Sequence, residues 1–315
     1  MTMQAFSPST IAVEIERYLR SGDSDMMGSA WPGDIMERGR SQRTALRGAL
    51  LDEVRRLSKG RTHAAVPDNA GVEFTRAKVE PMVRGLFPKA EQEVVLAMLE
   101  GSVVYVTSET IGSIIMNQSW NRSAWELANL FLLSVGAELL GPDAPHVVGI
   151  SEETTCYVSP DYFAEADPFA DFIVHEAAHV FHNCKRRTIG LRETRAKEWL
   201  LDIEYRRRET FAYACEAYAR VLSRAKGVAN CRALAAEYVA ERRIADERVD
   251  PDEVASIVLE AASARNGWKV ILARCAPMTN GSGQRPAPTS EITRLGTEVR
   301  RKSGRNYSSS SRLSR

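Results

Sequence analysis

Apolar side chains recur every three or four residues over much of the first hundred positions. This spacing is the period of a helix with one buried face, so the first part of the chain is predicted to be helical. The predicted helices cover residues 9–21, 41–59, 74–87 and 89–100. Pro88 separates the last two, and Gly101 follows the fourth, where a glycine commonly ends a helix.

Short runs of β-branched and aromatic residues predict three strands later in the chain, each bounded by turn-forming residues. The predicted strands cover residues 102–106, 146–150 and 154–159. Longer helices are predicted over 120–140, with Trp120 and Trp125 in the core, and over 192–225. Strands followed by helices indicate an α+β fold, with a small mixed sheet and a mainly helical C-terminal half.

Composition divides the chain into three parts. Residues 1–65 are predicted to form an N-terminal helical extension, and residues 66–275 the main domain. Residues 276–315 are rich in Ser, Gly, Pro and Arg and contain few large apolar side chains. Such a segment buries too little surface to offset the entropy lost on ordering, so we expect a disordered basic tail.

Charge and cysteine content narrow the class of protein. With 42 basic and 41 acidic side chains, the net charge is +1, which argues against a membrane or specific nucleic-acid partner. The five cysteines include no C-x-x-C pair, which is typical of free thiols in a reducing compartment. The chain begins without the basic and apolar regions of a signal peptide. We expect a cytoplasmic protein, although secretion by a signal-less route would leave no trace in the sequence.

The segment with the clearest chemistry is D-F-I-V-H-E-A-A-H-V-F-H-N-C, residues 171–184. Residues four apart lie one above the other on a helix, so His175 and His179 can bind one metal ion. Glu176 lies beside this pair, where a carboxylate can serve as general base without being a ligand. Apolar residues surround all three, and buried polar groups need a partner. We therefore predict a zinc site.

The surroundings of this motif also give expectations. Asp167-Pro168 precedes it, and an aspartate followed by proline suits the start of a helix, so the metal-binding helix is predicted to begin there. His182 follows His179 by three residues. A contact with a ligand histidine is one interpretation, but we expect an ordinary histidine on the helix face.

A catalytic zinc ion takes three protein ligands and leaves one position for water. A third histidine six residues after His179 is ruled out, because Lys185 occupies that position. The predicted helix over 192–225 instead offers Glu209 and Glu216, within the run E-T-F-A-Y-A-C-E-A-Y-A. They lie seven residues apart on one face, about 10 Å from each other, so only one can be the ligand. The other can hydrogen-bond a ligand histidine or Arg220.

These motifs resemble a known family. H-E-A-A-H on one helix, followed by a glutamate on a later helix, resembles the gluzincin branch of zinc metallopeptidases. The segment E-T-F-A-Y-A beginning at Glu209 is similar to the E-x-F-A-x-A run that carries the third ligand in lethal-factor-like peptidases. The resemblance covers these two motifs and the preceding strand. It implies a zincin-like fold in which His175, His179 and Glu209 bind one zinc ion per chain.

The resemblance also implies an activity and further site residues. Glu176 would be the general base in the hydrolysis of a peptide bond in a protein or peptide substrate, by a zinc-activated water. In such enzymes the strand before the metal helix is a sheet edge that pairs with extended substrate, and residues 156–159 would be the matching stretch. A tyrosine near the third ligand often stabilises the oxyanion, and Tyr205 and Tyr213 are the candidates here.

One alternative is a metal-free helical protein that binds partners through the basic tail. The other is a noncatalytic zincin-like module that binds a metal or protein partners in a regulatory role. Glu176 argues against it, because a purely structural metal site needs no general base.

Overall fold

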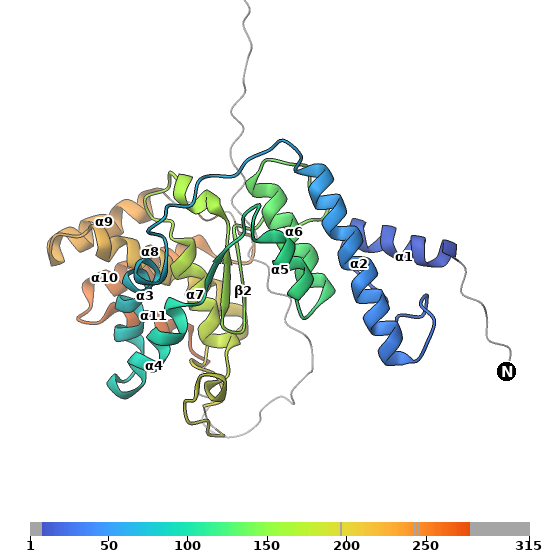
Figure 1. The fold of residues 1–315 in the computed structure, drawn as a ribbon. Coiled ribbons are helices and arrows are strands. Elements are labelled where there is room, and N and C mark those ends of the chain that lie inside the picture. Colours follow the sequence, from blue (N-terminus) through green and yellow to red (C-terminus); the bar gives the residue numbers. More distant parts are fainter. Residues whose placement is uncertain (1–7, 196, 242–243, 245, 278–315) are drawn as a thin grey trace, which may run out of the picture.

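A computed structural model describes residues 8–195, 197–241, 244 and 246–277. This part of the chain forms eleven α-helices, three short 3-10 helices and one sheet of three strands (Figure 1). The predicted α+β fold is confirmed. Residues 1–7 of the predicted extension and residues 278–315 of the predicted tail lie outside the described residues.

The helices fall into an N-terminal group, a middle group and a C-terminal group. Their bounds are α1 (Pro8–Ser21), α2 (Ile35–Leu57), α3 (Val72–Leu86), α4 (Lys89–Glu100), α5 (Ile111–Asn117), α6 (Asn121–Ser134), α7 (Phe172–Asn183), α8 (Arg208–Arg224), α9 (Val228–Glu241), α10 (Pro251–Ser263) and α11 (Gly267–Cys275). The 3-10 helices are η1 (Pro160–Ala164), η2 (Arg186–Ile189) and η3 (Tyr205–Arg207). Within the described residues, none of the helices combines the length and apolar character needed to cross a membrane.

The sheet has the strand order β1-β3-β2. β1 (Val103–Tyr105) runs parallel to β3 (Thr155–Val158), and β2 (Gly149–Glu152) runs antiparallel to it. The prediction that residues 156–159 form a sheet edge is therefore wrong, because β1 pairs with one side of β3 and β2 with the other. The outer strands of the sheet are β1 and β2.

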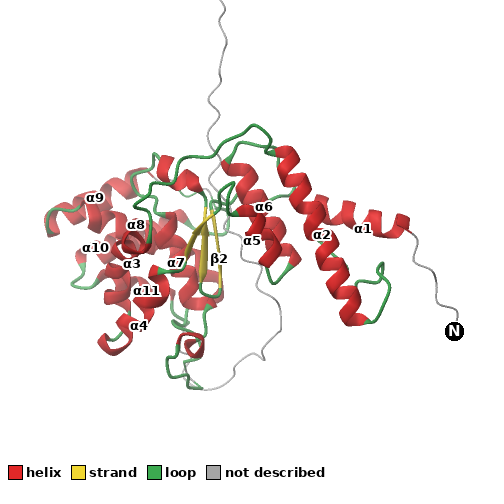
Figure 2. Ribbon diagram, in the orientation of Figure 1, coloured by secondary structure: helices red, strands yellow, loops and turns green. Residues whose placement is uncertain are grey.

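The sheet lies between two groups of helices (Figure 2). On one face, Cys156 and Val158 of β3 join the hydrophobic core that contains α7 and α8. On the other face, Ile150 and Tyr157 pack with α5 and α6, as expected where side chains alternate along a strand. Leu46 of α2 is fully buried in this second core. The N-terminal helices therefore share a core with the sheet.

α7 begins at Phe172, later than the Asp167-Pro168 start predicted from the sequence. Its N-cap is Asp171, whose side chain accepts a hydrogen bond from the Val174 N–H. Asp167 instead accepts one from the Phe169 N–H, in the turn before the helix. Lys78 Nζ lies 2.7 Å from Asp171 Oδ2. This pairing ties the start of α7 to α3.

The predicted helix over 192–225 is much shorter than expected, because α8 begins only at Arg208. The preceding stretch is held in an irregular conformation by contacts with the end of α7. Lys185 forms an isolated β-bridge with Trp199, and the Leu200 N–H donates to the Cys184 carbonyl. Glu209 consequently lies in the first turn of α8 rather than in the middle of a helix.

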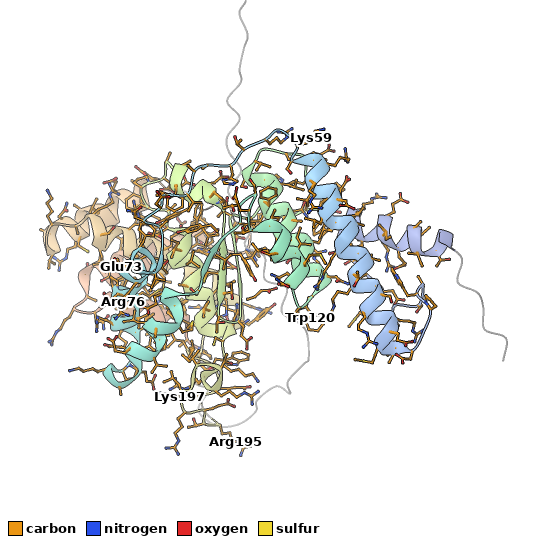
Figure 3. The ribbon with its side chains drawn as sticks, in the orientation of Figure 1. Lys59, Glu73, Arg76, Trp120, Arg195 and Lys197 are labelled. Carbon is orange, nitrogen blue, oxygen red and sulfur yellow. The ribbon has the colours of Figure 1, made fainter. Side chains whose placement is uncertain are left out.

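The predicted helix over 120–140 also ends early, at Ser134. Gly136 has a φ of +62°, and the Ala137 N–H donates to the Leu132 carbonyl. This is the usual way in which a left-handed glycine ends a helix. Trp125 is buried, as predicted, but Trp120 just before α6 is 53 % exposed (Figure 3). The expectation that Trp120 lies in the core is wrong.

Candidate metal centre

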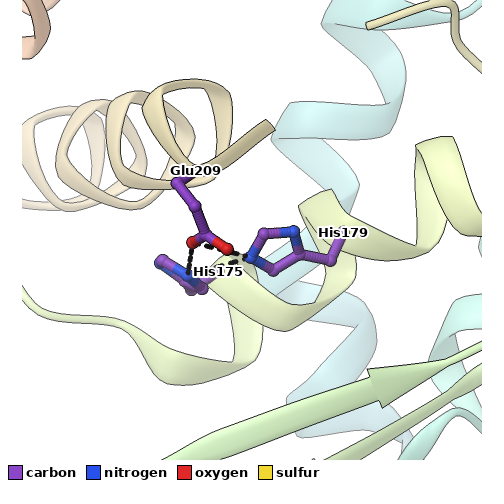
Figure 4. A group of neighbouring side chains, drawn as sticks. All are labelled: His175, His179 and Glu209. Atoms are coloured by element: carbon purple, nitrogen blue, oxygen red, sulfur yellow. Dashed lines mark hydrogen bonds and ion pairs between the residues drawn. The ribbon is translucent and has the colours of Figure 1, made fainter. Parts of the chain in front are cut away.

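Two helices bring three potential metal ligands together (Figure 4). His175 and His179 come from consecutive turns of α7, and Glu209 from the first turn of α8. The two Nε2 atoms of the histidines are 3.1 Å apart. Glu209 Oε2 lies 3.4 Å from His179 Nε2 and 3.7 Å from His175 Nε2. This buried cluster could hold a metal ion.

The environment of Glu209 fits a bound cation. Its Oε2 atom is buried and receives no hydrogen bond, whereas Oε1 lies 3.2 Å from Arg248 Nη1. A buried carboxylate oxygen without a donor costs free energy unless a positive charge meets it. Two imidazole nitrogens and one carboxylate oxygen form a donor set that suits a divalent transition metal. The three side chains therefore fit such an ion.

The other ring nitrogen of each histidine has its own partner. His175 Nδ1 lies 3.0 Å from Glu216 Oε2, and His179 Nδ1 lies 3.0 Å from His182 Nε2. Metal-binding histidines commonly have the second nitrogen hydrogen-bonded in this way, which fixes the ring orientation. Only the Nε2 atoms face Glu209.

Glu216 lies on the opposite side of the His175 ring from Glu209. Its Oε2 meets His175 Nδ1, and its Oε1 accepts a hydrogen bond of 2.8 Å from the Asp171 N–H. Glu216 thus joins α8 to the start of α7. The two glutamates that the sequence left as rivals contact different nitrogens of the same imidazole.

The charges of the cluster follow from burial and from these contacts. Burial disfavours the charged form of His175, but the nearby carboxylates of Glu209 and Glu216 outweigh it and raise the pKa of His175 to about 10. Burial alone would raise the pKa of Glu209, yet the neighbouring His179 and His175 hold that pKa well below its usual range. The site therefore places an anionic carboxylate opposite two imidazoles. One of them, His175, is positively charged at neutral pH when no metal is bound.

Glu176 lies between α7 and β2 and is only 1 % exposed. Its carboxylate packs against Gly149, because a Cβ atom built at that glycine would lie 2.5 Å from Glu176 Oε1. The candidate general base is thus confined by the backbone of β2.

Of the two candidate tyrosines, the structure brings Tyr213 to the site. Its ring packs edge-on against His175, with centroids 4.6 Å apart. Tyr205 lies in η3, is 65 % exposed and packs on the Arg208 guanidinium. Tyr213 follows Glu209 by one helical turn, which explains why both side chains reach the same histidine.

Sequence reasoning missed two residues of this site. His182 was expected to be an ordinary helix-face histidine, but it is 2 % exposed and contacts His179. Its position three residues after His179 was the available signal. Arg248 comes from the segment that follows α9, and Asp246 orients its guanidinium at 2.7 Å. Nothing in the local sequence indicated that Arg248 would reach Glu209.

A cavity of about 470 Å³ lies along β2. Its walls include Ser151 and Glu152 of β2, Asn183 at the end of α7, and Trp120. The cavity therefore adjoins the strand that confines Glu176.

No protein-family model, curated protein or solved structure matches this chain.

Proposed function

We propose that this protein is a zinc-dependent metallopeptidase with a zincin-like fold of the gluzincin type. The observation that carries the proposal is the convergence of His175 Nε2, His179 Nε2 and Glu209 Oε2 in one buried cluster. Glu176 follows the first of these ligands directly, and a structural metal site has no use for a base there. The resemblance of E-T-F-A-Y-A to lethal-factor-like peptidases adds support, because that run begins at Glu209.

The roles of the residues follow from their chemistry. His175, His179 and Glu209 would hold one zinc ion per chain. Zinc bound there would supply a Lewis acid that polarises a peptide carbonyl and lowers the pKa of water. The Glu176 carboxylate would accept a proton from the attacking water and pass it to the leaving amine. Tyr213, beside His175, is the better placed tyrosine for stabilising the developing oxyanion.

The substrate would be a protein or peptide, and β2 takes the pairing role that the resemblance gives to the strand before α7. The Ser159 N–H donates to the Val148 carbonyl, and Ile150 is the register partner of Tyr157. Hydrogen-bonded pairs alternate along antiparallel strands, so the backbone groups of Ser151 point away from β3. An extended peptide along β2 would pass next to Glu176.

The cysteines bear on where this activity would take place. All five are buried and free, as expected of thiols in a reducing compartment. We therefore propose a cytoplasmic location.

The alternative function is a noncatalytic metal-binding module that regulates or scaffolds a partner. The observation that favours it is burial, since His175, Glu176 and His179 are each at most 5 % exposed. A closed metal site commonly has a structural role. Glu176 is the feature that this alternative does not explain.

Digestion of a peptide library by the zinc-loaded protein separates the two functions. The wild-type protein should cleave peptides, and Glu176→Gln, which keeps the shape of the side chain but cannot take the proton, should lose at least about 10²-fold in rate. Glu176→Gln should still bind zinc. A wild-type protein that holds stoichiometric zinc and cleaves nothing would favour the noncatalytic module.

A further inference from the structure

A chain of hydrogen-bonded side chains leads from the metal cluster to β2. His179 Nδ1 lies 3.0 Å from His182 Nε2, and His182 Nδ1 lies 3.0 Å from Asn183 Oδ1. Asn183 Nδ2 then donates to Ser151 Oγ over 3.4 Å. His182 is only 2 % exposed, so its ring nitrogens depend on these side chains, rather than on solvent, for hydrogen bonds.

The orientation of the Asn183 amide decides which group donates and which accepts at each step of this hydrogen-bonded network. Its Nδ2 group donates to Ser151, so its Oδ1 accepts the proton on His182 Nδ1. With its proton on Nδ1, the His182 ring presents a lone pair at Nε2. His182 Nε2 is therefore an acceptor, and His179 Nδ1 is the donor. The proton of His179 lies on Nδ1, and its Nε2 presents a lone pair to the metal cluster.

We propose that His182 is a positioning residue of the metal centre, which keeps His179 in the tautomer that can bind a metal through Nε2. The inference rests on the metal-binding part of the proposed function and does not depend on hydrolysis. It also gives Asn183 and Ser151 a role, because they anchor His182 to β2, the strand that confines Glu176. The ligand histidine and the strand beside the general base are held by one network.

The hydrogen bonds of this network can also run in the opposite direction, with every donor and acceptor exchanged. That arrangement excludes metal binding. If the Asn183 amide turned over, its Nδ2 group would donate to His182 Nδ1. His182 Nε2 would then carry the proton and donate to His179 Nδ1. The proton of His179 would move to Nε2, where it occupies the lone pair that a metal needs. The property to measure is therefore which ring nitrogen of His179 carries the proton.

Two-bond ¹⁵N–¹H correlation spectra of the full-length, metal-free protein report the tautomer of each histidine ring directly. The chain has five histidines, so single His→Gln substitutions suffice to assign the rings. We expect the ring proton of both His179 and His182 in the wild-type protein to lie on Nδ1. A His179 ring that carries its proton on Nε2 would overturn the proposal.

A matched pair of variants tests the effect on metal affinity. His182→Gln keeps an acceptor for His179 and a donor for Asn183, whereas His182→Leu fills similar space and breaks both links. In competition with a chromogenic chelator, His182→Leu should bind zinc about 10–100-fold more weakly than the wild-type protein. His182→Gln should recover most of that loss. Wild-type affinity in His182→Leu, or equal losses in both variants, would contradict the proposal.

These experiments distinguish a loss of the positioning role of His182 from a loss of folding and from an absence of peptide hydrolysis. If circular dichroism shows that His182→Leu does not fold, Asn183→Leu takes its place, because it removes the acceptor from the half-buried end of the chain and should weaken zinc binding in the same direction. The tautomer and the affinity are both measured without a substrate. A protein that cleaves no peptide can therefore still support the positioning role, and loss of that role leaves the question of hydrolysis open to its own test.

Discussion

Gly149 of β2 lies directly against the side chain of Glu176 on α7. A Cβ atom at Gly149 would stand 2.5 Å from Glu176 Oε1 and 2.7 Å from its Cγ. Both distances are well inside van der Waals contact, so only a glycine leaves room for this carboxylate in its present position. The sheet thereby fixes where the candidate base lies relative to the two histidines of its own helix.

Replacing this glycine should disturb hydrolysis more than metal binding. In Gly149→Ala the carboxylate of Glu176 must move, while His175, His179 and Glu209 keep their places. A displacement of about 1 Å at a reacting group can cost about 10²-fold in rate. We expect a loss of that order in peptide cleavage, with zinc affinity close to that of the wild-type protein.

The control for this prediction is the double variant. Where Glu176 is already Gln, Gly149→Ala should reduce the rate no further, because both changes act through the same side chain. Additive losses in Gly149→Ala/Glu176→Gln would mean that the glycine acts elsewhere.

The two glutamates of α8 should differ in their effect on zinc binding. Glu209→Gln removes an anion from the cluster and should weaken zinc binding severely. Glu216→Gln keeps an acceptor for His175 Nδ1–H, so its loss should stay within about 10–100-fold. Zinc titrations of both variants measure the difference. The assignment is reversed if Glu216→Gln loses the metal and Glu209→Gln retains it.

Zinc binding should release a proton at neutral pH. Without metal, the pKa of His175 is raised to about 10 by Glu209 and Glu216 against the effect of burial. The ring is therefore protonated at pH 7.5, and a metal ion must displace that proton. Calorimetric titrations in buffers of different ionisation enthalpy should detect it. Proton uptake, or the same release from His175→Gln, would contradict the prediction.

The same shift predicts how the stability of the metal-free protein varies with pH. A histidine whose pKa is higher in the folded than in the unfolded chain stabilises the fold most below about 6.5. This contribution is lost as pH rises toward about 10. Denaturant titrations across that range should show a larger fall in the free energy of unfolding for the wild-type protein than for His175→Gln. Parallel curves for the two proteins would refute this assignment of charge.

Local sequence was sufficient to predict the helix that carries the candidate ligands. The apolar residues around His175 and His179 repeat with helical spacing, and α7 is buried as expected. The start of this helix was missed, because the cap depends on Lys78 of α3 and on Glu216 of α8, neither of which is near Asp171 in sequence.

Tertiary contacts decided what spacing along the chain could not. Glu209 and Glu216 share one helix face, and only the docking of α8 on α7 places one at Nε2 and the other at Nδ1 of His175. The order of strands in the sheet likewise depends on pairings between distant segments. Arg248 reaches Glu209 from beyond α9, a contact that has no local signature in the sequence.

X-ray absorption at the zinc edge, together with the zinc content per chain, tests the central claim most directly. The wild-type protein should hold about one zinc ion, with nitrogen and oxygen ligands at about 2.0–2.2 Å and the outer-shell scattering of two imidazoles. His179→Ala should lose both the metal and the signal. A sulfur ligand at about 2.3 Å, or a folded wild-type protein that takes up no zinc, would contradict a metal centre built from His175, His179 and Glu209.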